Sequence, residues 1–171
     1  MTYKALSTFS NKIKTQADYI MESTNLVSTL EEFGEVLVHG SYPLDIMYSA
    51  DIDIVVTAED IRAVSLNAFK TLIELRQFQK FEYGDFVKFR RENRPQGYII
   101  VLKTTVEDIK WEIEIWFLTS SVKEYNNFQW LKERINASAR KKILEAKHLR
   151  EVTGKTKHQL SSYELYKQIL S

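Results

Sequence analysis

The stretch Val36-Leu-Val-His-Gly-Ser-Tyr-Pro-Leu-Asp-Ile-Met-Tyr-Ser-Ala-Asp-Ile-Asp-Ile-Val-Val56 decides the fold of this chain. Its first apolar residues predict a short buried strand. A Gly40-Ser41 turn and a connector follow, and a second strand then opens with Asp51 and Asp53. Because side chains alternate along a strand, residues two apart point to the same face. Both carboxylates are therefore predicted on one face of the second strand, with apolar residues on the other.

These residue types are suited to metal and phosphate chemistry. Two carboxylates about 7 Å apart along a strand can bind a divalent cation. Mg²⁺, with Mn²⁺ as the alternative, prefers oxygen ligands and keeps phosphates as partners. Gly40 has no Cβ to keep a phosphate from the backbone, and Ser41 offers a hydroxyl and an N–H. A plain tight turn and a solvated Asp-x-Asp pair are the alternative interpretation, and the preceding buried strand favours the metal site.

Gly-Ser, nine intervening residues and then Asp-x-Asp resemble the motif of the nucleotidyltransferase superfamily. That superfamily includes polymerase beta-like enzymes, CCA-adding enzymes and antibiotic nucleotidyltransferases. The resemblance covers roughly residues 30–118. It implies transfer of a nucleoside monophosphate from an NTP to a hydroxyl, with release of pyrophosphate. In that interpretation Asp51 and Asp53 are catalytic metal ligands, and Gly40 and Ser41 bind the nucleotide triphosphate.

The superfamily pattern requires a third carboxylate on a later strand, and residues 110–118 (Lys-Trp-Glu-Ile-Glu-Ile-Trp-Phe-Leu) supply two candidates. Glu112 and Glu114 alternate with apolar residues and share the polar face. Related strands place the acid just before two apolar residues, which favours Glu114 and leaves Glu112 as the alternative. The resemblance implies that this group acts near the acceptor hydroxyl, as a base or metal ligand. Two exposed strand glutamates are the competing interpretation.

The pattern along the chain predicts an α/β (α+β) fold, a mixed β-sheet flanked by helices, with a C-terminal helical extension. Residues 1–8 are expected to be loose. Periodicity predicts helices over 10–30, 59–79, 122–151 with a break near Asn136, and 161–170, and strands over 81–91 and 97–105. We predict a nucleotidyltransferase catalytic domain over residues 1–120 and a helical extension over 121–171 that packs on it.

The amino-acid composition argues against several classes of function. The 171 residues carry a net charge of +1, which argues against a globally basic nucleic-acid binder. The chain has no cysteine, so disulfides, thiol catalysis and cysteine-based zinc sites are excluded, and a cytoplasmic location is predicted. No apolar run resembles a signal peptide or reaches membrane-spanning length, so no membrane partner is expected.

The distribution of basic residues indicates which polyanions the chain could bind. Segment 134–158 holds eight basic side chains against two acidic ones, which favours a polyanion contact or, alternatively, a solvated helix face. Candidates for phosphate contact on the later strands are Lys88, Arg90, Lys103 and Lys110, and the alternative interpretation of each is a solvated strand residue. The acceptor is predicted to be an RNA end, a protein or a small hydroxylated molecule. The competing hypotheses are a non-catalytic relative that binds a partner, such as one half of a toxin–antitoxin pair, and an RNA-binding module.

Overall fold

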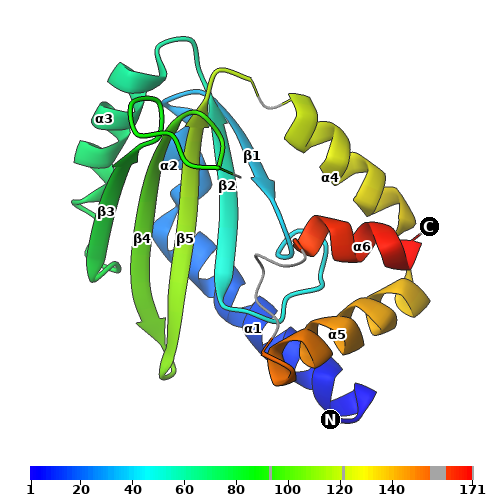
Figure 1. The fold of residues 1–171 in the computed structure, drawn as a ribbon. Helices are drawn as coiled ribbons and strands as arrows, with labels where there is room; N and C mark the ends of the chain where they lie inside the picture. Colours follow the sequence, from blue (N-terminus) through cyan, green and yellow to red (C-terminus); the bar gives the residue numbers. More distant parts are fainter. Residues whose placement is uncertain (93, 121, 155–160, 171) are drawn as a thin grey trace.

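The computed structural model of the chain describes residues 1–92, 94–120, 122–154 and 161–170. Within them a five-stranded mixed sheet has the order β1-β2-β5-β4-β3 (Figure 1). The strands are β1 (Glu35–His39), β2 (Asp51–Thr57), β3 (Lys80–Asp85), β4 (Tyr98–Val106) and β5 (Ile109–Leu118). β2 and β5 run parallel, whereas the other neighbouring strands are antiparallel. The predicted mixed sheet with flanking helices is therefore confirmed.

Three helices cover one face of the sheet: α1 (Tyr3–Thr24), α2 (Leu26–Glu31) and α3 (Ile61–Leu72). The expectation that residues 1–8 are loose is wrong, because α1 already begins at Tyr3. The Thr2 hydroxyl caps this helix by accepting a hydrogen bond from the Ala5 N–H, at 3.4 Å. Asn25 adopts the left-handed conformation, with φ 49°, and separates α1 from α2.

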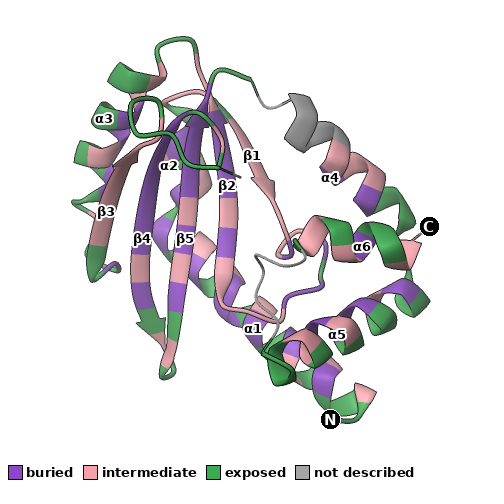
Figure 2. Ribbon diagram, viewed as in Figure 1, coloured by how far each residue is buried: buried purple, intermediate pink, exposed green. Residues whose placement is uncertain are grey.

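The alternation along β2 sets which face its acids occupy. Ile52, Ile54 and Val56 are fully buried against the helices of the covered face. Asp51 and Asp53 are half-buried and lie on the opposite face, as Figure 2 shows by the alternating colours of β2. Burying an isoleucine side chain stabilises the fold by about 1.5–3 kcal/mol. A register slip of one residue would expose these isoleucines and bury the carboxylates, so packing fixes the orientation of both acids.

The C-terminal part of the chain forms α4 (Val122–Arg134), α5 (Ala137–Val152) and α6 (Ser162–Leu170). The predicted break near Asn136 is confirmed, since its side chain accepts from the Ala139 N–H at 3.0 Å and caps α5. A second apolar cluster joins these helices to the connector between β1 and β2, through Leu44 and Ile46. None of the helices in the described ranges is long and apolar enough to cross a bilayer.

Two predicted elements end earlier than their patterns indicated. The helix expected to reach residue 79 ends at Leu72, and the strand expected over 81–91 ends at Asp85. The Asp85 carboxylate accepts hydrogen bonds from the Val87 and Lys88 N–H groups at 3.0 and 2.8 Å, which turns the chain out of the sheet. Residues 86–92 and 94–97 consequently lie outside the strands, and we name them the β3–β4 loop.

Candidate active site

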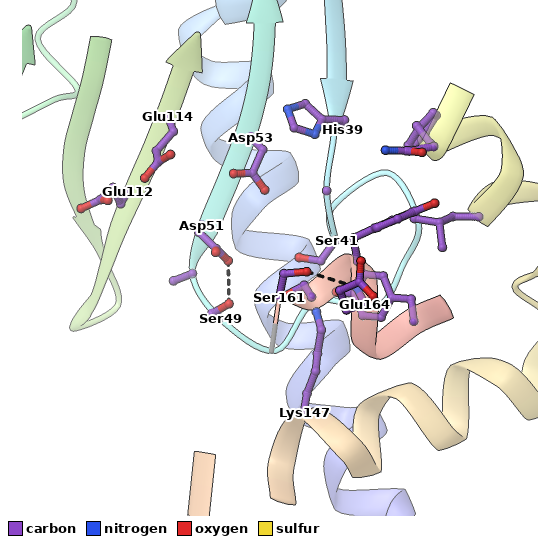
Figure 3. A pocket seen from close by; sticks show the side chains of 18 of the residues that line it. His39, Ser41, Ser49, Asp51, Asp53, Glu112, Glu114, Lys147, Ser161 and Glu164 are labelled. Carbon is purple, nitrogen blue, oxygen red and sulfur yellow. Dashed lines mark hydrogen bonds between the residues drawn. The ribbon is translucent and has the colours of Figure 1, made fainter. Parts of the chain in front are cut away.

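The parallel pairing of β2 and β5 brings the predicted acids together. Asp51 lies opposite Glu112, and Asp53 lies opposite Glu114, on the face of the sheet that the first three helices leave open. All four side chains line a cavity of about 850 Å³, and Figure 3 shows them along its sheet wall. The structure thus places both predicted aspartates and both candidate glutamates in one site.

The Gly40-Ser41 turn borders the same cavity. Gly40 follows β1 directly and has a φ of 74°, a region that favours glycine. A Cβ built at Gly40 would lie 2.2 Å from Oδ2 of Asp53. Ser41 is buried, with 8% of its surface exposed, and also lines the cavity. The turn therefore packs directly against a carboxylate of the Asp-x-Asp motif.

Each acid has a different set of partners. The Ser49 hydroxyl donates to Asp51 at 2.6 Å. Glu114 accepts hydrogen bonds from the Arg94 guanidinium at 3.2 Å and from the Trp116 indole N–H at 3.4 Å. These contacts orient Asp51 from the connector, and Glu114 both from the β3–β4 loop and from β5.

The two candidate third carboxylates differ in exposure as well as in partners. Glu112 forms an ion pair with Lys103 at 3.0 Å, and 43% of its side chain is exposed. The exposed share of the Glu114 side chain is 22%. Glu114 is therefore the more enclosed glutamate, whereas Glu112 is neutralised by a strand lysine.

A lysine from the C-terminal helices enters the cavity, and the sequence patterns did not single it out. Lys147 of α5 is only 4% exposed, and its ammonium donates to the Ile46 carbonyl oxygen at 2.7 Å. The same nitrogen lies 5.3 Å from the centre of the Tyr166 ring. One signal could have identified it: Lys147 follows Ile143 by four residues and Leu144 by three, so it shares their buried helix face.

Two further basic residues from the predicted sets, on β4 and α5, do not line the cavity. Lys103 forms ion pairs with Glu82 and Glu112 on the sheet. Arg140, at the start of α5, bonds to the connector and α1 instead of facing solvent. The basic segment also included Lys155, Lys157 and His158, which lie outside the described residues.

Helices α4 and α6 form the wall opposite the acids. Phe128 and Leu131 of α4 and Tyr163 and Tyr166 of α6 line the cavity. Burial raises the pKa of Tyr166 well above its ordinary value, and the nearby charges of Asp51 and Asp53 raise it further. The cavity thus has an acidic wall from strands and an aromatic wall from helices.

The donor set fits a divalent cation that is shared with a phosphate substrate. Mg²⁺ is usually held by one or two carboxylates plus substrate phosphates, not by an all-protein cage. Asp51 and Asp53 provide two hard oxygen ligands of this kind on one face of β2. In the described part of the chain, no three acidic or histidine side chains converge tightly enough to form a complete metal site. A bound nucleotide, together with water, would supply the remaining oxygen ligands.

No protein-family profile matches the sequence, and no curated protein matches it. Solved structures do match the fold. The Cid1 poly(U) polymerase with Mg and 3′-dATP bound shares 16% identity at a TM-score of 0.65, over 96% of this chain and 54% of that chain. The polymerase core of TRAMP, an RNA surveillance complex, shares 17% identity at a TM-score of 0.54, over 95% of this chain and 54% of that one.

A structure of the GLD-2/RNP-8 complex is also similar, with 13% identity and a TM-score of 0.60, over 95% of this chain and 57% of that chain. The chain therefore spans about half the length of the solved structures that it matches. At these identities the likeness establishes the fold. Together with the Gly-Ser and Asp-x-Asp pattern on that fold, it identifies this chain as having the nucleotidyltransferase fold.

Proposed function

We propose that the chain is a metal-dependent nucleotidyltransferase, which moves a nucleoside monophosphate from an NTP to a hydroxyl acceptor. One observation carries the proposal: Asp51 and Asp53 share a cavity with the Gly40-Ser41 turn, and Glu114 lies on the adjacent parallel strand. In this proposal Asp51 and Asp53 bind the metal. Glu114 acts beside the acceptor hydroxyl, as a proton acceptor or further ligand.

The reaction is a displacement at phosphorus. The acceptor oxygen forms a bond to the α-phosphorus, and the bond from that phosphorus to the oxygen that bridges it to the β-phosphorus breaks. The proton of the hydroxyl passes to Glu114 or to a water beside it, and pyrophosphate leaves with the negative charge. Such reactions depend mainly on positioning and on electrostatic stabilisation of the phosphates. A bound divalent ion would supply charge neutralisation at both the entering and leaving oxygens.

The cavity offers separate places for the parts of a nucleotide. Gly40 and Ser41 are proposed to bind the phosphates through their backbone and the serine hydroxyl. Lys147 is proposed to add a positive charge beside them, because a phosphate would offset the cost of keeping its ammonium out of bulk water. Phe128 and Tyr163, on the aromatic wall, are the proposed contacts for the base.

The acceptor is proposed to be the 3′ end of an RNA. The similar solved structures include a poly(U) polymerase and a cytoplasmic RNA terminal U-transferase, which favours a polynucleotide acceptor over a small molecule. One of them is a complex with a second protein, so a partner protein is a further possibility to test.

The experiment is incubation of the purified chain with each α-labelled NTP, with Mg²⁺ or Mn²⁺, and with separate RNA, protein and small-molecule acceptor fractions. We expect label to enter the RNA fraction with the native chain. The variant Asp51→Asn/Asp53→Asn should transfer none, because the amides cannot replace the charged ligands. A matched control is Glu59→Gln, which removes an exposed carboxylate outside the cavity and should keep full activity.

Equal labelling by the native chain and the Asp51→Asn/Asp53→Asn variant would contradict the proposal. Absence of transfer to every fraction by the folded chain would favour the competing hypothesis, a non-catalytic protein that acts by binding a partner. In that case, a stable complex with a second protein should form equally well with both aspartates replaced.

A further inference from the structure

The β3–β4 loop is basic and exposed, and the proposed reaction gives it no role. Among its described residues, Lys88, Arg90, Arg91 and Arg94 are exposed cations, against the single acid Glu92. No other loop between two strands of the described sheet has such a composition. The positive charge is therefore concentrated in the segment that connects the edge strand β3 to β4.

An exposed aromatic ring lies among these charges. Phe89 is 65% exposed, and the Lys88 ammonium lies 5.2 Å from the centre of its ring. Exposed phenylalanines are costly in water, and nothing in the described fold covers this one. Aromatic faces beside cations are the combination with which proteins bind single-stranded nucleic acid, because bases stack on the ring and cations neutralise the backbone.

The base of the loop is anchored to the sheet. The Phe86 N–H donates to the Gly97 carbonyl at 2.9 Å, and the Phe86 ring packs on Trp116 with ring centres 5.2 Å apart. Arg91 in turn lies over the Phe86 ring, at 5.5 Å from its centre. The loop therefore presents its cations from a fixed base in front of β4 and β5, where Figure 1 shows it in green.

The far end of the loop reaches the active site. Arg94 lines the cavity, and its guanidinium forms an ion pair with Glu114 at 3.2 Å. Glu114 is the carboxylate assigned to the acceptor hydroxyl in the proposed function. A strand bound along the loop toward Arg94 would consequently bring its end to the side of the cavity where the acceptor has to react.

We propose that the β3–β4 loop binds the acceptor as a single-stranded RNA, with Phe89 stacking on a base and Arg90, Arg91 and Arg94 contacting its phosphates. This inference rests on the proposed function for the identity of the acceptor. It adds the surface on which the acceptor lies. Flexible single strands fit the loop better than a duplex, whose bases are stacked inside and unavailable to Phe89.

The test is fluorescence anisotropy of a labelled single-stranded RNA of about 15 nucleotides, a length within the range covered by single-strand-binding folds. Full-length chain is titrated without NTP or divalent metal, so that the result does not depend on catalysis. We expect Arg90→Ala/Arg91→Ala to weaken binding at least tenfold and to reduce its salt dependence. Phe89→Ala should weaken binding at least fivefold, since it removes the ring on which a base would stack.

The matched control is Arg62→Ala/Lys70→Ala, which removes two exposed cations from α3 on the other face of the sheet. It should bind RNA as the native chain does. Unchanged affinity in both loop variants, or absence of RNA binding by the native chain, would overturn the inference. If the proposed function alone is wrong, the results differ from these. The loop variants then lose RNA affinity, but the native chain transfers no nucleotide.

Discussion

The carboxylate of Asp53 occupies the space into which a side chain at Gly40 would project, with only 2.2 Å between Oδ2 and a Cβ built there. This contact joins the turn proposed to bind phosphates to an acid proposed to bind metal. Neither group can be altered at this point without moving the other.

Replacing Gly40 by alanine is therefore expected to abolish most activity. The new methyl group would displace the Asp53 carboxylate, and we expect transfer to fall at least a hundredfold. The positive φ adds a stability cost of about 1–3 kcal/mol. Gly154→Ala is the control, because Gly154 also has a positive φ, 65°, but no atom of the described residues within 4 Å of its Cβ position. If both variants lost activity equally, backbone strain and not the Asp53 contact would be the cause.

Lys147→Met is expected to weaken nucleotide binding through the phosphates. A hydrogen bond to a charged group contributes about 1.5–3 kcal/mol, so the NTP affinity should fall about tenfold or more. Affinity for the corresponding nucleoside, which has no phosphates, should stay unchanged. Equilibrium binding of both ligands measures this difference. Lys142→Met removes an exposed lysine from the same helix and should change neither affinity, and equal NTP binding by both variants would refute the role of Lys147.

Arg140→Ala should destabilise the fold. The Arg140 guanidinium donates to the Asp45 carbonyl at 2.7 Å, to the Ser7 hydroxyl at 3.1 Å and to the Asn11 side chain at 2.8 Å. It thereby connects α5 to the connector and to α1. We expect the free energy of unfolding in urea to fall by about 2–3 kcal/mol. Lys142→Ala should change it by less than about 0.5 kcal/mol, as is usual for exposed positions.

Stability should decrease at alkaline pH because of Tyr166. Burial raises the pKa of its phenol above the ordinary value of 10.0. Above that pH the unfolded chain releases the proton and the folded chain keeps it, so the unfolded state gains stability as pH rises. The slope contributed by one such group is at most about 1.4 kcal/mol per pH unit.

Urea unfolding of Tyr166→Phe between pH 9 and 11 measures this effect. Its stability should depend less steeply on pH than that of the native chain. Tyr19→Phe is the control, because Tyr19 is 61% exposed in the folded chain. If the stability of Tyr166→Phe fell with pH as steeply as that of the native chain, groups other than Tyr166 would cause the loss of stability at alkaline pH.

Much of the sheet wall of the site could be predicted from the sequence, because alternation along a strand is a local property. The pattern around Asp51 and Asp53 predicted their shared face, and the pattern around Glu114 predicted its polar face. Pairing of β2 with β5 then placed these faces side by side. The motif predicted the order of these strands along the chain, whereas their parallel pairing became known only from the structure.

The rest of the site depends on contacts between distant residues, which local patterns do not contain. Lys147 belongs to a basic segment that was predicted to be either a polyanion contact or a solvated helix face, and only its packing against the connector buries it. The pattern of residues 81–91 predicted a strand throughout, but the Asp85 carboxylate competes for backbone N–H groups and ends β3. Arg94 lies between the two strands predicted over 81–91 and 97–105, and its contact with Glu114 forms only when that segment folds over the sheet.

The cavity is lined both by residues 39–53 and by residues 161–166, which the ribosome makes more than a hundred positions later. Proteins often begin to fold from their N-terminal part during synthesis. The sheet and its acids can thus form while the wall from α6 has yet to emerge. A nascent chain would then carry an open, half-built site, and the proposed nucleotide pocket would close only after α6 has been made.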